Sequence, residues 1–400
     1  MRLLALAAVL AILPVTAQGA PPPPDSFDAL HWRMVGPFRG GRTKACAGVP
    51  GHSNVFYIAP VNGGVWKTDD AGRTWGSIFD NQPTQSIGSL ALAPSDPKII
   101  YAGSGEGLLR PDLSVGNGVY KSTDAGTTWT HVGLDNAQQI PQIAIDPRNP
   151  NRVYAAVLGH PYGPSKDRGV YRSLDGGKSW DKVLYKNDNT GASDIVIDPK
   201  HPDVIYAAMW EARLGPWEDD NEYEDAGGGL YKSTDGGTTW KQLHGGLPAN
   251  LVQADIAIAA SKPSTLYVTL TTTEESHYGS GKGNGLFRSD DAGDTWHSVT
   301  TDDRPLMKIG GGDLMVPVVD PTNPETLYVA SIVAMQSHDG GKTWTWLRGA
   351  PGGDDYQNLW VNPADPKTIL LVSDQGAVIT FNGGATWSSW YNQPTAQLYH

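Results

Sequence analysis

The chain has 400 residues, a net charge of −12 and a hydrophobic fraction of 39%, which suffices for a packed core at this length. Its 48 glycines and 30 prolines, without a collagen period, indicate many turns and short strands. The acidic balance argues against nucleic acid and against an anionic membrane surface as partners.

The first 20 residues have the pattern of a secretory signal peptide. Arg2 starts it, residues 3–15 form its apolar core, and residues 15–17 offer a small-residue cleavage site. The apolar run is too short to span a bilayer, and no later run is long enough. Residues 21–30 follow as a proline-rich leader. We therefore predict a secreted or periplasmic protein without a membrane span.

From residue 31 to residue 400 one octapeptide pattern, Ser/Thr-x-Asp-x-Gly-x-Thr/Ser-Trp, recurs seven times. The first copy covers residues 68–75, and successive copies are spaced 54, 51, 60, 56, 48 and 43 residues apart. This period suits one blade of a β-propeller. The third positions of the seven copies are Asp70, Asp124, Asp175, Asp235, Asp291, Asp339 and Asn382.

Strand patterns surround each octapeptide in a fixed order. In the third unit, residues 143–145 and 153–156 are two apolar strands joined by an Asp-Pro turn. A third strand, such as residues 118–122, ends at the octapeptide, and a fourth follows the tryptophan. We therefore predict an all-β fold, a single seven-bladed β-propeller over residues 31–400. Each blade would have four antiparallel strands, with the octapeptide in the hairpin between the third and fourth.

The octapeptide has a mechanical reason for its residue types. An aspartate can accept hydrogen bonds from the N–H groups of a tight turn, and glycine supplies the positive φ that such a turn needs. The tryptophan anchors the small blade against its neighbours. The seven octapeptide Asp and Asn residues are therefore predicted to be structural rather than catalytic. Cys46, the only cysteine, is interpreted as a small buried strand residue.

Strand order also predicts where a ligand site lies. The loops between second and third strands share one face, opposite the octapeptides, and the long ones are residues 104–117, 159–168, 210–228 and 271–284. Long loops on a rigid scaffold commonly carry binding residues, so their aromatic and charged side chains could hold a sugar or a peptide. With Asn62 of the first unit, the candidates are Glu106, Arg110, His160, Tyr162, Trp210, Glu211, Trp217, Glu218, His277 and Tyr278.

No cofactor or metal site is predicted from the sequence. The acidic run at residues 218–225 offers oxygen ligands to Ca²⁺, but it lacks EF-hand spacing, and a solvated acidic loop is the simpler interpretation. The scattered histidines have no zinc spacing.

The octapeptides are similar to the BNR or Asp-box repeats of bacterial sialidases, family 74 glycoside hydrolases (xyloglucanases), sortilin-type receptors and photosystem assembly propellers. Residues 31–37, 61–68 and 390–400 further resemble large bacterial proteins described as sortilin N-terminal or BNR-type glycosyl hydrolases. The resemblance covers residues 31–400. It implies a second propeller C-terminal to this chain as a partner domain.

The catalytic residues that this resemblance implies are incomplete. Xyloglucanases place one catalytic Asp in a first-blade segment similar to Asp-x-Gly-Gly-Ala-Tyr, and residues 61–66 match it with Asn62 near the Asp position. An amide cannot act as general acid or base, and glycoside hydrolysis needs two carboxyl groups. For a sialidase, Arg39 and Arg42 are a weak substitute for the arginines that the chemistry needs.

We therefore expect an exported binding or scaffold module that recognises a glycan or a polypeptide on this loop face and is not catalytic alone. The alternative is the N-terminal half of a family-74-like glycoside hydrolase acting on plant β-glucan or xyloglucan.

Overall fold

The structure is a computed structural model that describes residues 40–110, 113–214, 222–274, 283–307, 309, 313–350 and 352–395, with the backbone alone for 222–226. Residues 36–400 form one compact unit. The predicted signal peptide and leader lie outside the described residues. Within the described part of the chain, no helix is long and apolar enough to cross a membrane.

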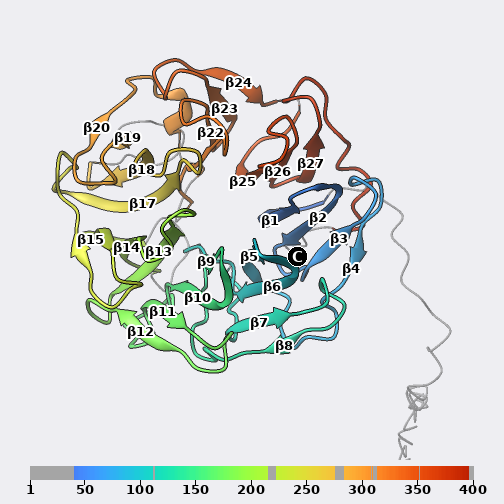
Figure 1. The fold of residues 1–400 in the computed structure, drawn as a ribbon, viewed down its shortest axis with the longest axis horizontal. Coiled ribbons are helices and arrows are strands. Elements are labelled where there is room, and N and C mark those ends of the chain that lie inside the picture. Colours follow the sequence, from blue (N-terminus) through green and yellow to red (C-terminus); the bar gives the residue numbers. More distant parts are fainter. Residues whose placement is uncertain are drawn as a thin grey trace, which may run out of the picture. The chain divides into compact units, whose positions relative to one another are not determined.

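Seven antiparallel sheets follow one another around a ring (Figure 1). The strands of the first four sheets are β1 (Thr43–Val49), β2 (His52–Pro60), β3 (Trp66–Thr68), β4 (Gly76–Ser77); β5 (Ile87–Ala93), β6 (Asp96–Ser104), β7 (Val119–Ser122), β8 (Thr130–His131); β9 (Gln142–Asp146), β10 (Asn149–Val157), β11 (Gly169–Ser173), β12 (Asp181–Leu184); and β13 (Thr190–Ile197), β14 (Ile205–Leu214), β15 (Glu222–Ser233), β16 (Lys241–Gln242).

The last three sheets contain β17 (Leu251–Ile258), β18 (Leu266–Thr272), β19 (Asn284–Ser289), β20 (His297–Ser298); β21 (Val316–Val319), β22 (Leu327–Ala330), β23 (Ala334–Ser337), β24 (Thr345–Arg348); and β25 (Tyr356–Val361), β26 (Ile369–Ser373), β27 (Gly376–Thr380), while a 3₁₀ turn, η2 (Arg304–Leu306), precedes β21.

The predicted seven-bladed propeller is therefore confirmed. Six described sheets have four strands and the seventh has three. After the seventh octapeptide, Ser388 donates its N–H to the Ile379 carbonyl at 2.8 Å, and its hydroxyl accepts the Ile379 N–H at 2.9 Å. This short segment takes the place of a fourth strand.

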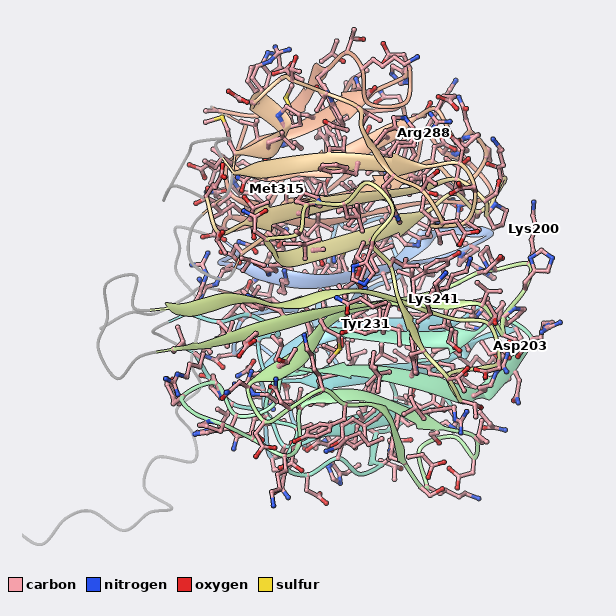
Figure 2. All side chains as sticks on the ribbon, turned by 90° about the vertical axis from the view of Figure 1, so that its left-hand side faces the viewer. Lys200, Asp203, Tyr231, Lys241, Arg288 and Met315 are labelled. Atoms are coloured by element: carbon pink, nitrogen blue, oxygen red, sulfur yellow. The ribbon has the colours of Figure 1, made fainter. Side chains whose placement is uncertain are left out.

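The two faces of the ring differ as the strand order predicts. The turns between first and second strands lie on the same face as the octapeptides. Figure 2 shows Lys200 and Asp203, from one such turn, projecting at one face, whereas Met315, which precedes β21, lies toward the other. We call that other face, which carries the loops between second and third strands, the loop face.

Each octapeptide closes its hairpin with side-chain hydrogen bonds. In the second copy, Asp124 accepts the Thr128 N–H at 2.8 Å and the Thr128 hydroxyl at 2.7 Å. The Ser122 hydroxyl donates to Asp124 at 2.8 Å and accepts the N–H of Gly126, whose φ is 89°. These hydrogen bonds, first those of Thr128, lower the pKa of Asp124 to about 2. The carboxylate is thus occupied within its own turn.

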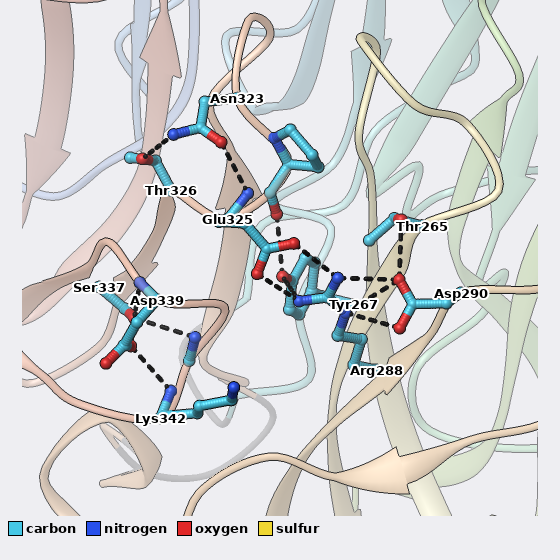
Figure 3. A network of polar contacts seen from close by, with 12 residues as sticks. Thr265, Tyr267, Arg288, Asp290, Asn323, Glu325, Thr326, Ser337, Asp339 and Lys342 are labelled. Atoms are coloured by element: carbon cyan, nitrogen blue, oxygen red, sulfur yellow. Dashed lines mark hydrogen bonds and ion pairs between the residues drawn. The ribbon is translucent and has the colours of Figure 1, made fainter.

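Neighbouring blades are joined by a repeated tyrosine contact. The hydroxyl of a second-strand tyrosine donates to a backbone carbonyl of the next blade in five cases, namely Tyr57 to Ala125, Tyr101 to Pro150, Tyr154 to Gly236, Tyr206 to Ala292 and Tyr267 to Pro324. In the fifth blade, Arg288 lies over the Tyr267 ring and forms ion pairs with Asp290 of its own blade and with Glu325 of the next blade (Figure 3). Each of the first five blades is therefore hydrogen-bonded to the next.

The first and last blades close the ring by packing. Phe56 and Trp75 of the first blade share an apolar cluster with Leu370 and Ile379 of the last. A Cβ atom built on Gly48 would lie 2.3 Å from the Trp360 ring, so this approach requires glycine. No described strand is exchanged between these two sheets. Hydrogen bonds add to the packing, since the Gly40 N–H donates to the Gln375 carbonyl at 3.0 Å and the Asn392 amide donates to the Arg73 carbonyl at 3.0 Å.

Candidate functional site

A cavity of about 320 Å³ lies at the centre of the ring, lined by the first strand of every sheet. We call it the axial cavity. Hydrophobic side chains line part of its wall, and the polar side chains that line it include Lys44, Asp194, Trp210, Gln253, Asp255 and Asn358. It exists because the first strands converge there, so it combines residues from all parts of the chain.

Two of these carboxyl groups come from adjacent blades. Asp194 on β13 accepts the Ile195 N–H at 2.7 Å and the Ile256 N–H at 2.8 Å. Burial, which outweighs these hydrogen bonds, raises the pKa of Asp194 to about 6. Burial and the neighbouring Asp194 raise the pKa of Asp255 to about 8. Burial lowers the pKa of Lys44, although Asp255 opposes this shift. The cavity therefore disfavours charge on each of these groups.

A second group of charged side chains gathers on the loop face. Arg42 precedes β1, Glu106 and Arg110 lie between β6 and β7, Asp313 precedes β21, Asp355 precedes β25, and Asp374 follows β26. We call these six residues the loop-face cluster. They come from four blades, and only ring closure brings them together.

Ion pairs hold this cluster in place. The Arg42 Nη2 atom lies 3.4 Å from Glu106 Oε2, and both side chains are buried. Arg110 forms an ion pair with buried Asp313. Burial raises the pKa of Asp355 to about 6, with further contributions from Asp374 and Asp354 that Arg110 opposes. Burial is the main cause of this shift, and the neighbouring carboxyl groups add to it.

Comparison with known proteins agrees with this architecture. A family model described as "Sortilin, neurotensin receptor 3" matches residues 117–277. The chain is 27% identical to xyloglucanase Xgh74A of Acetivibrio thermocellus, over 79% of this chain and 38% of that protein. It is 23% identical to a probable oligoxyloglucan-reducing end-specific xyloglucanase of Neosartorya fischeri, over 90% of this chain and 47% of that protein.

The chain resembles the sortilins and the family 74 xyloglucanases. It spans less than half the length of these two curated relatives. The solved GH74 xyloglucanase of Xanthomonas campestris matches 88% of this chain and 53% of its own, with a TM-score of 0.65 and 19% identity. YCF48 bound to D1 peptide matches 86% of this chain and 94% of its own, with a TM-score of 0.51 and 14% identity. These structural matches establish the fold.

The first-blade segment that resembles the xyloglucanase catalytic segment carries no carboxyl group. Asn62 lies between β2 and β3 on the loop face, is exposed, and has a φ of 55°. Asparagine is among the residues that tolerate this left-handed backbone. The residue before it, Val61, is buried and apolar.

Six of the other predicted candidates lie in the described part of the chain, as three pairs. Glu106 and Arg110 belong to the loop-face cluster. His160 and Tyr162 lie together between β10 and β11, with ring centroids 5.8 Å apart. Trp210 and Glu211 are on β14. The last four candidates, Trp217, Glu218, His277 and Tyr278, lie outside the described residues.

Trp210 is placed differently from a surface stacking residue. Its side chain is 1% exposed and packs against Leu109, Leu158 and Ala212. It also lines the axial cavity, where its indole N–H has no hydrogen-bond partner in the described part of the chain. The indole is therefore enclosed in the wall of the ring and is not available to a ligand on the loop surface.

Sequence reasoning missed Asp313, Asp355 and Asp374. None lies in a long loop; each stands beside a first strand or in a tight turn. The useful signal was a charged residue next to the loop-face end of an apolar strand, because such residues border the ring centre. Cys46 fits its interpretation only in part, since it is half-buried on β1 and borders the axial cavity, and burial raises its pKa to about 12.

Proposed function

We propose that this chain is an exported binding module that recognises a glycan or a polypeptide on its loop face and is not catalytic alone. The observation that carries the proposal is the loop-face cluster. Arg110, Asp355 and Asp374 are partly exposed there, and the buried pair of Arg42 with Glu106 and the pair of Arg110 with Asp313 hold the cluster in place. A rigid array of this kind suits recognition of hydroxyl or peptide groups.

The comparisons bear on which of the two ligand classes is favoured. Curated relatives that are named xyloglucanases support a glycan. The YCF48 structure, which contains a bound peptide, shows that a similar propeller can take a polypeptide. Carboxylates and guanidinium groups both hydrogen-bond sugar hydroxyls, so the cluster suits the first class. We therefore place the glycan first.

The predicted location and partner belong to the same proposal. The signal-peptide pattern in residues 1–20 supports a secreted or periplasmic protein. A second propeller, C-terminal to this chain, is the partner domain that the longer xyloglucanases suggest.

One observation favours the alternative, the N-terminal half of a family-74-like glycoside hydrolase acting on plant β-glucan or xyloglucan. Asp355 has a pKa raised to about 6 and so retains its proton at mildly acidic pH, as a general acid must. The amide at Asn62 weighs against this alternative, since it supplies neither acid nor base.

Residues 21–400 test the two functions together. Binding of xyloglucan oligosaccharides and of a peptide library is measured beside a reducing-sugar assay. We expect Asp355→Asn and Arg110→Gln to weaken binding by about tenfold or more. Asp135→Asn is the matched control, because it makes the same Asp-to-Asn change at a side chain that is 79% exposed. It should leave binding unchanged.

We expect no turnover of xyloglucan, including in Asn62→Asp. Hydrolysis by the wild type that Asp355→Asn abolishes would replace the proposal by the hydrolase alternative. Binding that persists in both cluster variants would show that the ligand uses another surface.

A further inference from the structure

The axial cavity is lined by two ionisable groups that make no direct polar contact with the described protein. They are the amine of Lys44 and the carboxyl group of Asp255. Neither forms a hydrogen bond or an ion pair with another described residue. A buried charge without a partner is costly, so both groups retain interaction capacity for a ligand.

Trp210 forms part of the wall of the same cavity. Its side chain is 1% exposed, and its indole N–H is itself buried and has no hydrogen-bond partner in the described part of the chain. The polar groups that the cavity presents to a ligand are therefore the amine of Lys44 and the carboxyl group of Asp255.

The two groups come from different blades, Lys44 from β1 and Asp255 from β17. Asp255 and Asp194 favour the charge on Lys44, whereas Arg110 and Arg42 disfavour it, and Asp194 disfavours ionisation of Asp255. A ligand with one charge would pair with one of the two groups and leave the other unpaired.

We propose that the axial cavity binds a small zwitterion, with its carboxylate at Lys44 and its ammonium group at Asp255. Free α-amino acids and short peptides share this chemistry. A volume of about 320 Å³ admits a molecule of that size. The site is separate from the loop-face cluster, and its ligand is independent of the proposed glycan or polypeptide.

Other ligand classes fit less well. The described residues hold no group of three or more His, Cys, Asp or Glu side chains suited to a metal ion. A neutral sugar would leave Lys44 and Asp255 without a charged partner. A zwitterion offers a charged partner to both groups.

Calorimetry and thermal shift on the folded chain test this site. The probes are the standard amino acids and glycylglycine, and each binder is compared with its N-acetyl and its amide derivative, which lack one charge. We expect at least one zwitterion to bind and both derivatives to bind about tenfold more weakly or worse. Binding of glycylglycine alone would identify a peptide source, and binding of single amino acids a free one.

Variants locate the site. Lys44→Met and Asp255→Asn should each reduce affinity by about tenfold or more, while Asp135→Asn, at an exposed side chain, should not. The double variant Lys44→Met/Asp255→Asn removes both buried charges, so its fold does not depend on an unpaired one. It should fold and not bind.

Proton release on ligand binding is a measurement that would not change if Asp255 had only a structural role. Asp255 has a pKa of about 8 and faces Asp194 and Lys44, so an arriving ammonium group should ionise it and release a proton near pH 7. The binding enthalpy should then vary with the ionisation enthalpy of the buffer in the wild type and not in Asp255→Asn. Failure of every zwitterion to bind, equal binding of an N-acetyl derivative, or binding by the double variant would each overturn the proposal.

Discussion

Arg168 allows a quantitative test of how the loop face is held. Its side chain is fully buried. It donates hydrogen bonds to four backbone carbonyls, those of Asn189 at 3.1 Å, Ala212 at 2.8 Å, His160 at 2.9 Å and Gly163 at 3.2 Å. These contacts tie the loop before β11 to the next blade. Arg168→Met keeps the aliphatic length and removes all four donors.

The expected loss follows from these contacts. A hydrogen bond from a charged donor contributes about 1.5–3 kcal/mol, and the lower part of that range applies because two contacts exceed 3.0 Å. Burial lowers the pKa of Arg168 to about 10, so removing the charge recovers about 3 kcal/mol. We expect the free energy of unfolding to fall by about 3–5 kcal/mol, as when a partner of a buried charge is removed.

Urea unfolding followed by circular dichroism measures the change. The matched control is Arg148→Met, because the Arg148 side chain is 65% exposed and its ion pair with Asp146 is 4.0 Å long. The control should change stability by less than about 0.5 kcal/mol. Limited proteolysis of the variant should cut first within residues 159–168. A free energy of unfolding for Arg168→Met that lies within about 1 kcal/mol of the control's would refute the reasoning.

Three further predictions concern the blades. The pKa of Asp124 is lowered to about 2, so the stability contributed by its ionised carboxylate is present above the unfolded pKa of about 3.9 and is lost as the pH falls toward 2. A free energy of unfolding that stays constant from pH 5 to pH 2 would contradict this. Gly48→Ala should cost about 1–3 kcal/mol against Trp360 in thermal unfolding, whereas Gly76→Ala, with open space around it, should be harmless. Tyr154→Phe should lower the free energy of unfolding by about 1 kcal/mol, measured in urea, and an unchanged value would show that the contact between blades contributes nothing.

The local units of this fold could be predicted from the sequence because their determinants are close together. The contacts of Asp124 all lie within its own octapeptide, from Ser122 to Thr128. Turn chemistry over eight residues, repeated seven times, therefore predicts the hairpins, the blades and the face on which the long loops lie. The same reasoning placed Glu106 and Arg110 correctly on that face.

The sites depended on the tertiary structure, because ring closure sets which first strands meet. Arg42 and Asp374 approach one another only through the contact between the first and last blades, and no local pattern links them. Trp210 is of a residue type that often stacks on ligands at protein surfaces. Packing against Leu109 and Leu158 instead places it in the wall of the axial cavity. Lys44 and Asp255 belong to different blades and line the same cavity because their strands converge at the ring centre. The sequence predicts each of these strands separately and not which of them meet. Short-range hydrogen bonds decide the repeat, while long-range packing decides which of its charges are buried together.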